Sequence, residues 1–256
     1  ELNPMFENAI LPRLRKMSKA AWVIKSRTIK ISGGAESQVN KAVKKLLELK
    51  PPTTVGIYAK LGHVELRIMT KAKNEKLAQA AIDRIEKKVR AKLGGYIFGA
   101  DDETLEGAVA GLLAGKKMTI AAAESCTGGL LSDRLTNISG SSRYFVMGLV
   151  AYSNSVKENV LGVSKYTLRD HGAVSEEVAL EMAKRIRSLG GTDIGIGITG
   201  IAGPKGGTKK KPVGLVYIAL VLPRKKVVKE FRFKGSRDEI KFLSTQVALD
   251  LIRKNI

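Results

Sequence analysis

The 256-residue sequence is poor in several residue types, and each shortage excludes a class of protein. Its single cysteine, Cys126, excludes a framework of intramolecular disulfides and is typical of a reducing compartment, so we expect a cytoplasmic protein. Two histidines beside that one cysteine leave little for a zinc site. No apolar run approaches the roughly 20 residues that span a bilayer. No basic segment followed by an apolar one suggests a signal peptide, so we expect no membrane partner.

Acidic residues are also scarce relative to basic ones. The chain has 24 Asp and Glu against 45 Lys and Arg, a formal net charge of +21. Such an excess indicates an anionic partner, either a phosphate-bearing small molecule or a nucleic acid. The lysines of the first 100 residues fall mostly on predicted helix faces, however, and a solvated Lys-rich surface of the kind found in thermophiles explains them equally.

Hydrophobic residues make up 44% of the chain, enough for two domains. Residues 1–18 hold two prolines and no clear period, and we interpret them as a connector. Residues 19–100 predict the order β-α-β-β-α, a small α+β module, with a hairpin turning near Gly62 and a last helix that starts near Asn74 and is closed by Gly94 and Gly95.

Residues 101–256 alternate strands with helices, which predicts a layered α/β domain. Buried strands are expected around residues 118–125, 144–153 and 192–200. A hairpin that turns at Pro223 and Arg224 predicts an antiparallel edge, and residues 236–255 are expected to form a terminal helix.

A candidate nucleophile lies in "AAAESCTGGLLSDRL", residues 121–135, where a strand meets a helix. Ser125 stands at the turn, and the N–H groups of Thr127, Gly128 and Gly129 precede a helix, where backbone donors lack intrahelical partners. A serine there has the setting of a nucleophile beside an oxyanion hole. A hydroxyl that only caps the helix is the alternative.

A serine nucleophile needs a base, and neither histidine is an obvious partner. Lys157 lies in the first turn predicted for "NSVKENVLG", where the helix dipole disfavours an ammonium. Burial would lower its pKa further and make it a base. A plain surface lysine is the alternative.

Two further stretches suggest a site for an anion. "ITGIAGPKGGTKKKPVG", residues 198–214, leaves a strand at Thr199 and Gly200 and continues through Gly203 in a Gly-rich loop. Its spacing matches neither a P-loop nor a dinucleotide fingerprint. Arg237 begins the last helix, where an arginine can hold a phosphate, although a solvated arginine is the alternative.

Four stretches together resemble one family. "AESCTGG", "GSSRYFVMGLVAYSNSVKENVLGV", "HGAVSEEVALEMA" and "GITGIAGPKGGTKKKPVGLVYIAL" are similar to the C-terminal domain of the CinA (competence/damage-inducible protein A) family, whose members with this domain are nicotinamide mononucleotide amidohydrolases. The preceding module resembles that family's KH-like middle module. "ELNPMFENAILPRL" resembles the end of its N-terminal molybdopterin-binding-like domain, so we expect a piece of a longer protein.

The resemblance implies a function and a set of site residues. It places the catalytic pair on Ser125 and Lys157, the supporting tyrosine on Tyr152, the loop threonine on Thr199 and the C-terminal arginine on Arg237. It implies hydrolysis of the carboxamide of nicotinamide mononucleotide without metal or organic cofactor, and a homodimer. The middle module lacks the G-x-x-G loop of nucleic-acid-binding KH domains, so we do not expect a nucleic-acid partner. A basic adaptor that binds nucleic acid through that module is the alternative function.

Overall fold

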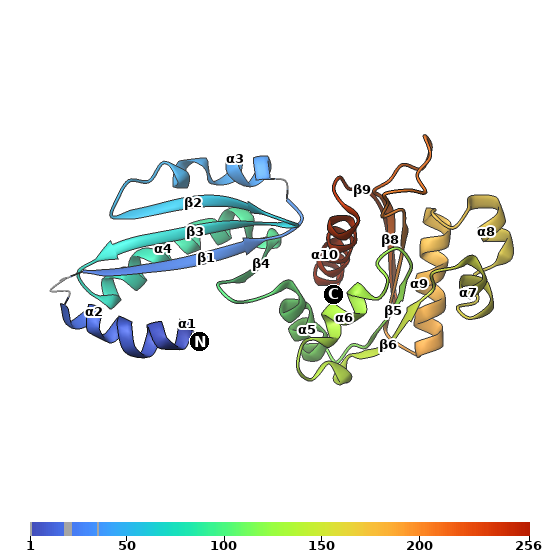
Figure 1. Ribbon diagram of the computed structural model, residues 1–256, viewed down its shortest axis with the longest axis horizontal. Helices are drawn as coiled ribbons and strands as arrows, with labels where there is room; N and C mark the ends of the chain where they lie inside the picture. Colours follow the sequence, from blue (N-terminus) through green and yellow to red (C-terminus); the bar gives the residue numbers. More distant parts are fainter. Residues whose placement is uncertain (1, 18–21, 35) are drawn as a thin grey trace. The chain divides into compact units, whose positions relative to one another are not determined.

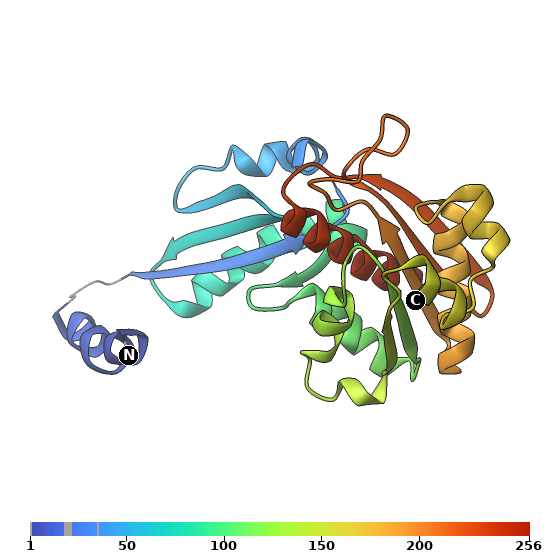
Figure 2. The ribbon, with the colours of Figure 1, turned by 45° about the vertical axis from the view of Figure 1, so that its right-hand side comes forward.

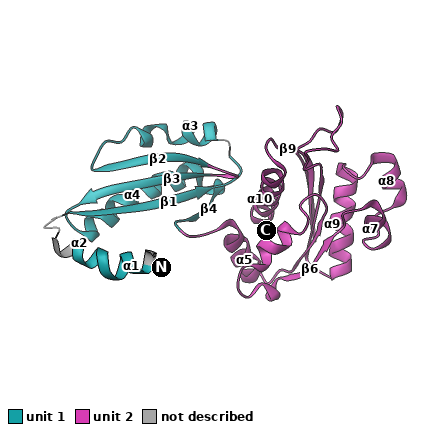
Figure 3. Cartoon of the chain, in the orientation of Figure 1, with its two compact units in different colours: residues 1–59, 64–101 teal, residues 60–63, 102–256 magenta. Residues whose placement is uncertain are grey.

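The computed structural model describes residues 2–17, 22–34 and 36–256, which form two compact units (Figure 3). The first unit comprises residues 1–59 and 64–101, and the second comprises residues 60–63 and 102–256. The predicted junction between connector and module, at residues 18 and 19, lies outside the described residues. In the described residues, no helix combines the length and apolarity needed to cross a membrane.

The beginning of the first unit is helical, whereas the sequence analysis found no clear period there and interpreted it as a connector. Helices α1 (Leu2–Met5) and α2 (Leu11–Met17) flank a π-helical segment, Phe6–Ile10. Pro12 has no N–H to donate to the carbonyl four residues earlier, and the widened π-helical turn directly precedes it. These helical segments were not predicted because the two prolines interrupt the periodic spacing of apolar residues that identifies a helix.

The predicted β-α-β-β-α order of the first module is confirmed, with one strand added. The elements are β1 (Val23–Ile31), α3 (Glu36–Leu47), β2 (Thr53–Lys60), β3 (His63–Ala72), α4 (Glu75–Leu93) and β4 (Ile97–Ala100). Asn74 caps α4 by accepting from the Leu77 N–H. The sheet has the order β2-β3-β1-β4, and β1 pairs antiparallel with both β3 and β4. The sequence analysis had placed these four residues at the end of the module but had predicted no strand there.

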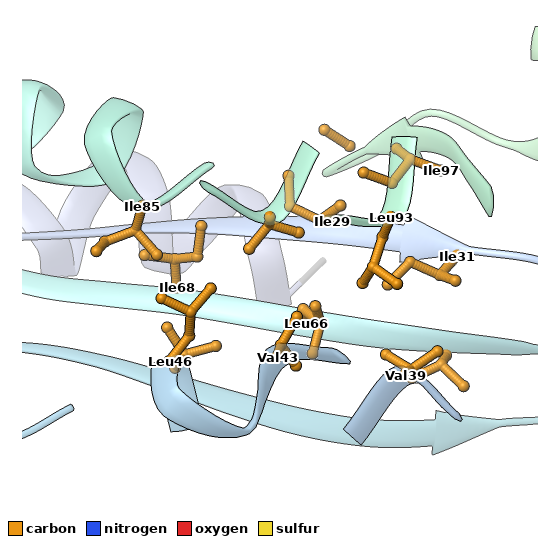
Figure 4. Packing of buried hydrophobic residues seen from close by; sticks show 14 of the residues in the cluster. Ile29, Ile31, Val39, Val43, Leu46, Leu66, Ile68, Ile85, Leu93 and Ile97 are labelled. Atoms are coloured by element: carbon orange, nitrogen blue, oxygen red, sulfur yellow. The ribbon is translucent and has the colours of Figure 1, made fainter. Parts of the chain in front are cut away.

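The core of this module lies between the sheet and its two helices (Figure 4). Alternate residues of the strands point into it, as Ile29 and Ile31 do in β1. Helix α3 contributes Val39, Val43 and Leu46, at the spacing that places side chains on one helix face. The Lys-rich opposite faces of the helices remain in solvent, so the positive charge of the module is compatible with a solvated surface.

The second unit is a five-stranded sheet with helices on both faces (Figures 1 and 2). Its strands are β5 (Ile120–Glu124), β6 (Phe145–Val150), β7 (Ile194–Gly200), β8 (Leu215–Leu222) and β9 (Lys225–Arg232). Helices α5 (Leu105–Gly115), α6 (Leu130–Thr136) and α10 (Arg237–Asn255) cover one face, and α7 (Asn154–Asn159), α8 (Lys165–His171) and α9 (Glu176–Gly190) lie on the other. The predicted layered α/β architecture is confirmed.

Close packing of α9 explains the glycines of β7. A Cβ atom on Gly195 would collide with the carbonyl oxygen of Ala183, and one on Gly197 with that of Ala179. Glycine therefore lets the helix backbone approach the strand directly. All residues of β5 and nearly all of β7 are buried, as expected for strands covered on both faces.

The strand order makes the carboxyl end of β5 a topological switch point, where the connections from neighbouring strands run to opposite sides. The order is β6-β5-β7-β8-β9. Strands β6 and β7 are both parallel to β5, β8 pairs antiparallel with β7, and β9 pairs antiparallel with β8. The chain therefore leaves β5 for a neighbour on one side and later returns on the other. In open α/β sheets, ligands bind in the crevice outside the carboxyl ends of strands at such a point. The residues that follow β5, β6 and β7 all meet there.

Candidate active site

The turn after β5 presents Ser125. Gly128 and Gly129 adopt positive φ angles of 64° and 94°, a left-handed conformation that favours glycine, and Gly129 is the N-cap of α6. The Gly128 N–H donates to the Ser125 carbonyl at 3.1 Å, and the Ser125 N–H donates to the Ile198 carbonyl of β7 at 2.9 Å. These bonds fix the backbone of Ser125 at the end of the central strand.

Glu124, the last residue of β5, bonds to the first turn of α6 and so joins the strand to the helix. Its buried carboxylate accepts from the N–H of Leu131 at 3.0 Å, from the N–H of Ser132 at 2.8 Å and from the Ser132 hydroxyl at 2.7 Å. A carboxylate at a helix start satisfies unpaired donors and interacts favourably with the helix dipole. The first turn of α6 is thus occupied by the protein's own carboxylate.

Lys157 reaches Ser125 from the fourth position of α7. Its Nζ atom lies 3.0 Å from Ser125 Oγ and donates to the carbonyl oxygens of Ala151 at 2.7 Å and Tyr152 at 3.2 Å. The side chain is 1% exposed, and Ser153 caps the short helix that carries it. The alternative that Lys157 is a surface lysine is therefore wrong.

Burial sets the charge state of the groups around Ser125. Removal from water lowers the pKa of the Lys157 amine, opposed by a weaker attraction to Cys126. Burial likewise raises the pKa of the Cys126 thiol to about 12. At neutral pH this thiol is protonated and is a poor nucleophile. The chemistry of the pair therefore centres on the serine hydroxyl and the lysine amine.

A cavity of about 260 Å³ opens in front of this pair. Its walls come from the ends of three parallel strands, from the segment before α9 and from the start of α10. They are formed by Ser125, Cys126, Tyr152, Lys157, Ala173, Val174, Thr199, Gly200, Ile201, Ala202, Gly203, Lys205, Gly206 and Arg237. A larger hollow of about 620 Å³ lies along α9, but its lining residues Lys184 and Ser188 are not joined by a hydrogen bond in the described part of the chain.

Hydrogen bonds tie the walls of this cavity together. The Thr199 hydroxyl donates to the Ala173 carbonyl at 2.6 Å, which joins the end of β7 to the segment before α9. Arg237 donates through Nη1 to the Gly203 carbonyl at 2.6 Å and through Nη2 to the Tyr152 hydroxyl at 3.0 Å. One arginine thus links α10, the Gly-rich loop and the segment after β6.

The structure brings most of the predicted site residues together. Seven of them line the cavity: Ser125, Tyr152, Lys157, Thr199, Gly200, Gly203 and Arg237. Thr127, Gly128 and Gly129 do not. The two glycines shape the turn, and the fully buried Thr127 hydroxyl has no hydrogen-bond partner among the described residues. The Gly128 N–H is already bonded to the Ser125 carbonyl, and the predicted role of Thr127 and Gly129 as oxyanion donors stays a prediction.

Sequence reasoning missed three residues at this site. Glu124 carried one signal, a carboxylate at the end of a buried strand directly before a turn. Cys126 lines the cavity, and its place after the nucleophile was the signal, because the N–H at that position commonly serves an oxyanion hole. Lys205 lines the cavity from the Gly-rich loop, where nothing distinguished it from Lys209 and Lys210 in the sequence.

The second unit is therefore a three-layer α/β domain with a buried serine–lysine pair at the carboxyl end of its central strand. Residues 102–256 match the family model of the CinA C-terminal domain, and residues 26–99 match that of the damage-inducible protein CinA KH domain. The chain belongs to the CinA family.

Relatives and solved structures agree with this assignment. A protein of Moorella thermoacetica named for competence-damage induction is 48% identical over 256 residues, and a CinA-like protein of Kosmotoga olearia is 46% identical over 254. They match 100% and 99% of this chain, which spans 62% and 61% of their lengths. The competence/damage-inducible protein of Agrobacterium tumefaciens is 37% identical with a TM-score of 0.57, over 57% of this chain and 90% of its own. That of Klebsiella pneumoniae is 34% identical with a TM-score of 0.58, over 59% and 94%.

Proposed function

We propose that the second unit hydrolyses the carboxamide of nicotinamide mononucleotide to nicotinic acid mononucleotide and ammonia. The observation that carries the proposal is the distance of 3.0 Å between Lys157 Nζ and Ser125 Oγ at the bottom of the cavity. A nucleophile within hydrogen-bond reach of a base with a lowered pKa is the arrangement that covalent catalysis by serine requires.

The first half of the reaction forms an acyl-enzyme. Neutral Lys157 takes the proton of the Ser125 hydroxyl as Oγ attacks the carboxamide carbon. The Ala151 and Tyr152 carbonyls hold the amine in place while it gains that proton. When the carbon–nitrogen bond breaks, Lys157 returns the proton to the departing nitrogen, which leaves as ammonia, and the Tyr152 hydroxyl assists from the cavity wall.

The second half restores the serine. Water gives a proton to Lys157 as its oxygen attacks the acyl carbon, Lys157 passes that proton to the departing Ser125 oxygen, and the carboxylic acid formed loses its own proton to solvent. The negative oxygen of each tetrahedral intermediate needs N–H donors close to Ser125. Cys126 supplies the nearest candidate on the cavity wall, and Thr127 and Gly129 remain the predicted neighbours in the turn.

The charge of the cavity supports a substrate that carries a phosphate. No aspartate or glutamate is among its lining residues, whereas Lys157, Lys205 and Arg237 are. Lys157 lies at the buried end beside Ser125, so the 5′-phosphate belongs at the other end, near Arg237 and the Gly-rich loop. No step of this mechanism needs a metal or an organic cofactor.

Ammonia release tests the proposal. The parent protein is expected to release ammonia from the mononucleotide, and Ser125→Ala is expected to reduce the rate by a factor on the order of 10⁴ or more, because the covalent route is lost. Cys126→Ala is the matched control on the neighbouring side chain and should stay close to the parent rate. An active Ser125→Ala beside an inactive Cys126→Ala would assign the nucleophile to the thiol. A parent that releases no ammonia would refute the proposed reaction.

A further inference from the structure

The two exposed cations of the cavity have different surroundings. Arg237 directs two of its nitrogens at the protein itself, at the Gly203 carbonyl and the Tyr152 hydroxyl. Gly203 lies two residues before Lys205 in the chain. Arg237 therefore holds the stretch of the Gly-rich loop that presents Lys205 to the cavity.

The base of the same loop is anchored by the backbone. The Ile201 N–H donates to the Leu215 carbonyl at 2.9 Å, and the Gly214 N–H donates to the Ile201 carbonyl at 2.7 Å. A turn farther along is closed by the Thr208 N–H, which donates to the Lys211 carbonyl at 2.8 Å. Lys205 thus projects from a segment that is fixed on both sides, which limits the entropy lost when its side chain binds.

Lys205 is the one lysine of this loop that lines the cavity. Lys211 donates to the His171 carbonyl at 2.7 Å, and Lys209 and Lys210 are exposed and outside the lining. Within residues 2–17, 22–34 and 36–256, no hydrogen bond or ion pair involves the Lys205 ammonium. An ammonium that faces a cavity without carboxylates is available to an anionic ligand.

We propose that Lys205 is a specificity-determining residue: its ammonium contacts the phosphate of the substrate and selects a pyridine mononucleotide over the corresponding riboside. The proposal rests on the proposed function and adds the residue that reads the phosphate. A hydrogen bond to a charged group contributes more than a neutral one, and at an exposed position we expect a factor of about 10 in kcat/KM.

The test compares Lys205→Met with the matched control Lys209→Met on nicotinamide mononucleotide and nicotinamide riboside. Lys205→Met is expected to raise KM for the mononucleotide about 10-fold, with a much smaller change in kcat, and to weaken the dependence of KM on salt. The riboside carries no phosphate, so its kcat/KM should change far less. Lys209→Met should retain the parent's preference. An unchanged preference in Lys205→Met, or an equal loss in the control, would overturn the proposal.

Binding without turnover separates this inference from the proposed reaction. The affinity of Ser125→Ala for the mononucleotide is compared with that of the double variant Ser125→Ala/Lys205→Met by calorimetry. About 10-fold weaker binding by the double variant supports the role of Lys205 even if the parent releases no ammonia. Equal affinities, or no binding by either protein, would refute it.

Discussion

At the scale of single residues, the site depends on keeping one lysine neutral. An exposed lysine has a pKa near 10.4 and is almost entirely protonated at neutral pH. Burial at 1% exposure disfavours the ammonium, so the pKa of Lys157 is lowered. The fraction of neutral amine at neutral pH rises accordingly, and with it the fraction of molecules in which Lys157 is able to accept the Ser125 proton.

This lowered pKa predicts the pH dependence of the rate. Protonated Lys157 cannot act as a base, so kcat/KM should rise from acid pH through one ionisation and level off above the pKa of Lys157, which burial places below that of an exposed lysine. Lys157→Arg keeps the charge but cannot be deprotonated, and it should be as inactive as Lys157→Ala. The pH–rate profile of the parent and the rate of the arginine variant check this. A variant that retains a tenth of the parent rate would show that Lys157 supplies charge alone.

The sequence predicted these residues better than it predicted their surroundings. Ser125 was recognisable from the strand, the turn and the glycines around it, and Lys157 from its place against the helix dipole. Both assignments depended mainly on the resemblance of the long motifs to one family. Taken alone, Ser125 could have been only a helix cap and Lys157 only a surface lysine. The bond of Arg237 to Tyr152 and the exposure of Lys205 to the cavity join residues far apart in the chain, and no local pattern records them.

At the scale of elements, a buried arginine connects the helices on the face of α10. Arg134 of α6 donates to Glu106 of α5 at 2.5 Å and, at 2.7 Å each, to Thr245 and Gln246 of α10. Its guanidinium also lies 4.8 Å from the ring centre of Phe242. This network fixes α6, which follows the nucleophile turn, relative to α10, which begins with Arg237.

Removing that arginine should destabilise the second unit. Arg134→Ala leaves Glu106 and two buried polar groups without their partner, and the free energy of unfolding should fall by about 3–5 kcal/mol. Arg232→Ala is the control, because Arg232 pairs with Glu230 at the surface and should contribute about 0–1 kcal/mol. Denaturant titrations of the parent and both variants measure the difference. A loss below 1 kcal/mol for Arg134→Ala would contradict the structural role given to this network.

Helices and strands with a clear apolar period or a recognisable cap or turn were predicted, and elements without such a local signal were missed. The helix start near Asn74 and the hairpin turn at Pro223 and Arg224 were each found from local chemistry and are confirmed. Strand β4 was missed because four residues are too short for an alternating pattern, and its pairing with β1 is a long-range contact. The helical segments within residues 2–17 were missed because two prolines leave no clear period in that stretch.

At the scale of the whole molecule, the site and its supporting core belong to one of the two units. Every residue that lines the cavity lies within residues 102–256, as do the five strands and their helices. The solved structures of relatives cover 57% and 59% of this chain, close to the share of that unit. The geometry of Ser125 and Lys157 does not depend on the positive charge of the first unit. The homodimer and the cytoplasmic location stay predictions.

This organisation predicts that the second unit works alone. A protein of residues 102–256 should fold and should retain the parent's kcat/KM for the mononucleotide within about a factor of three, because its core and cavity are complete without the KH-like module. Circular dichroism shows whether the shortened protein is folded, and ammonia release measures its activity. A folded fragment with a rate reduced by 100-fold or more would assign a catalytic contribution to residues outside it.

The position of α10 also orders events during synthesis. This helix follows every other element of the second unit along the chain, yet it supplies Arg237 to the cavity and the partners of Arg134. A ribosome makes the serine turn, the lysine and the Gly-rich loop before it makes the helix that binds them together. A nascent chain therefore carries Ser125 and Lys157 while it still lacks the assembled cavity, which is complete only when α10 docks on α5 and α6.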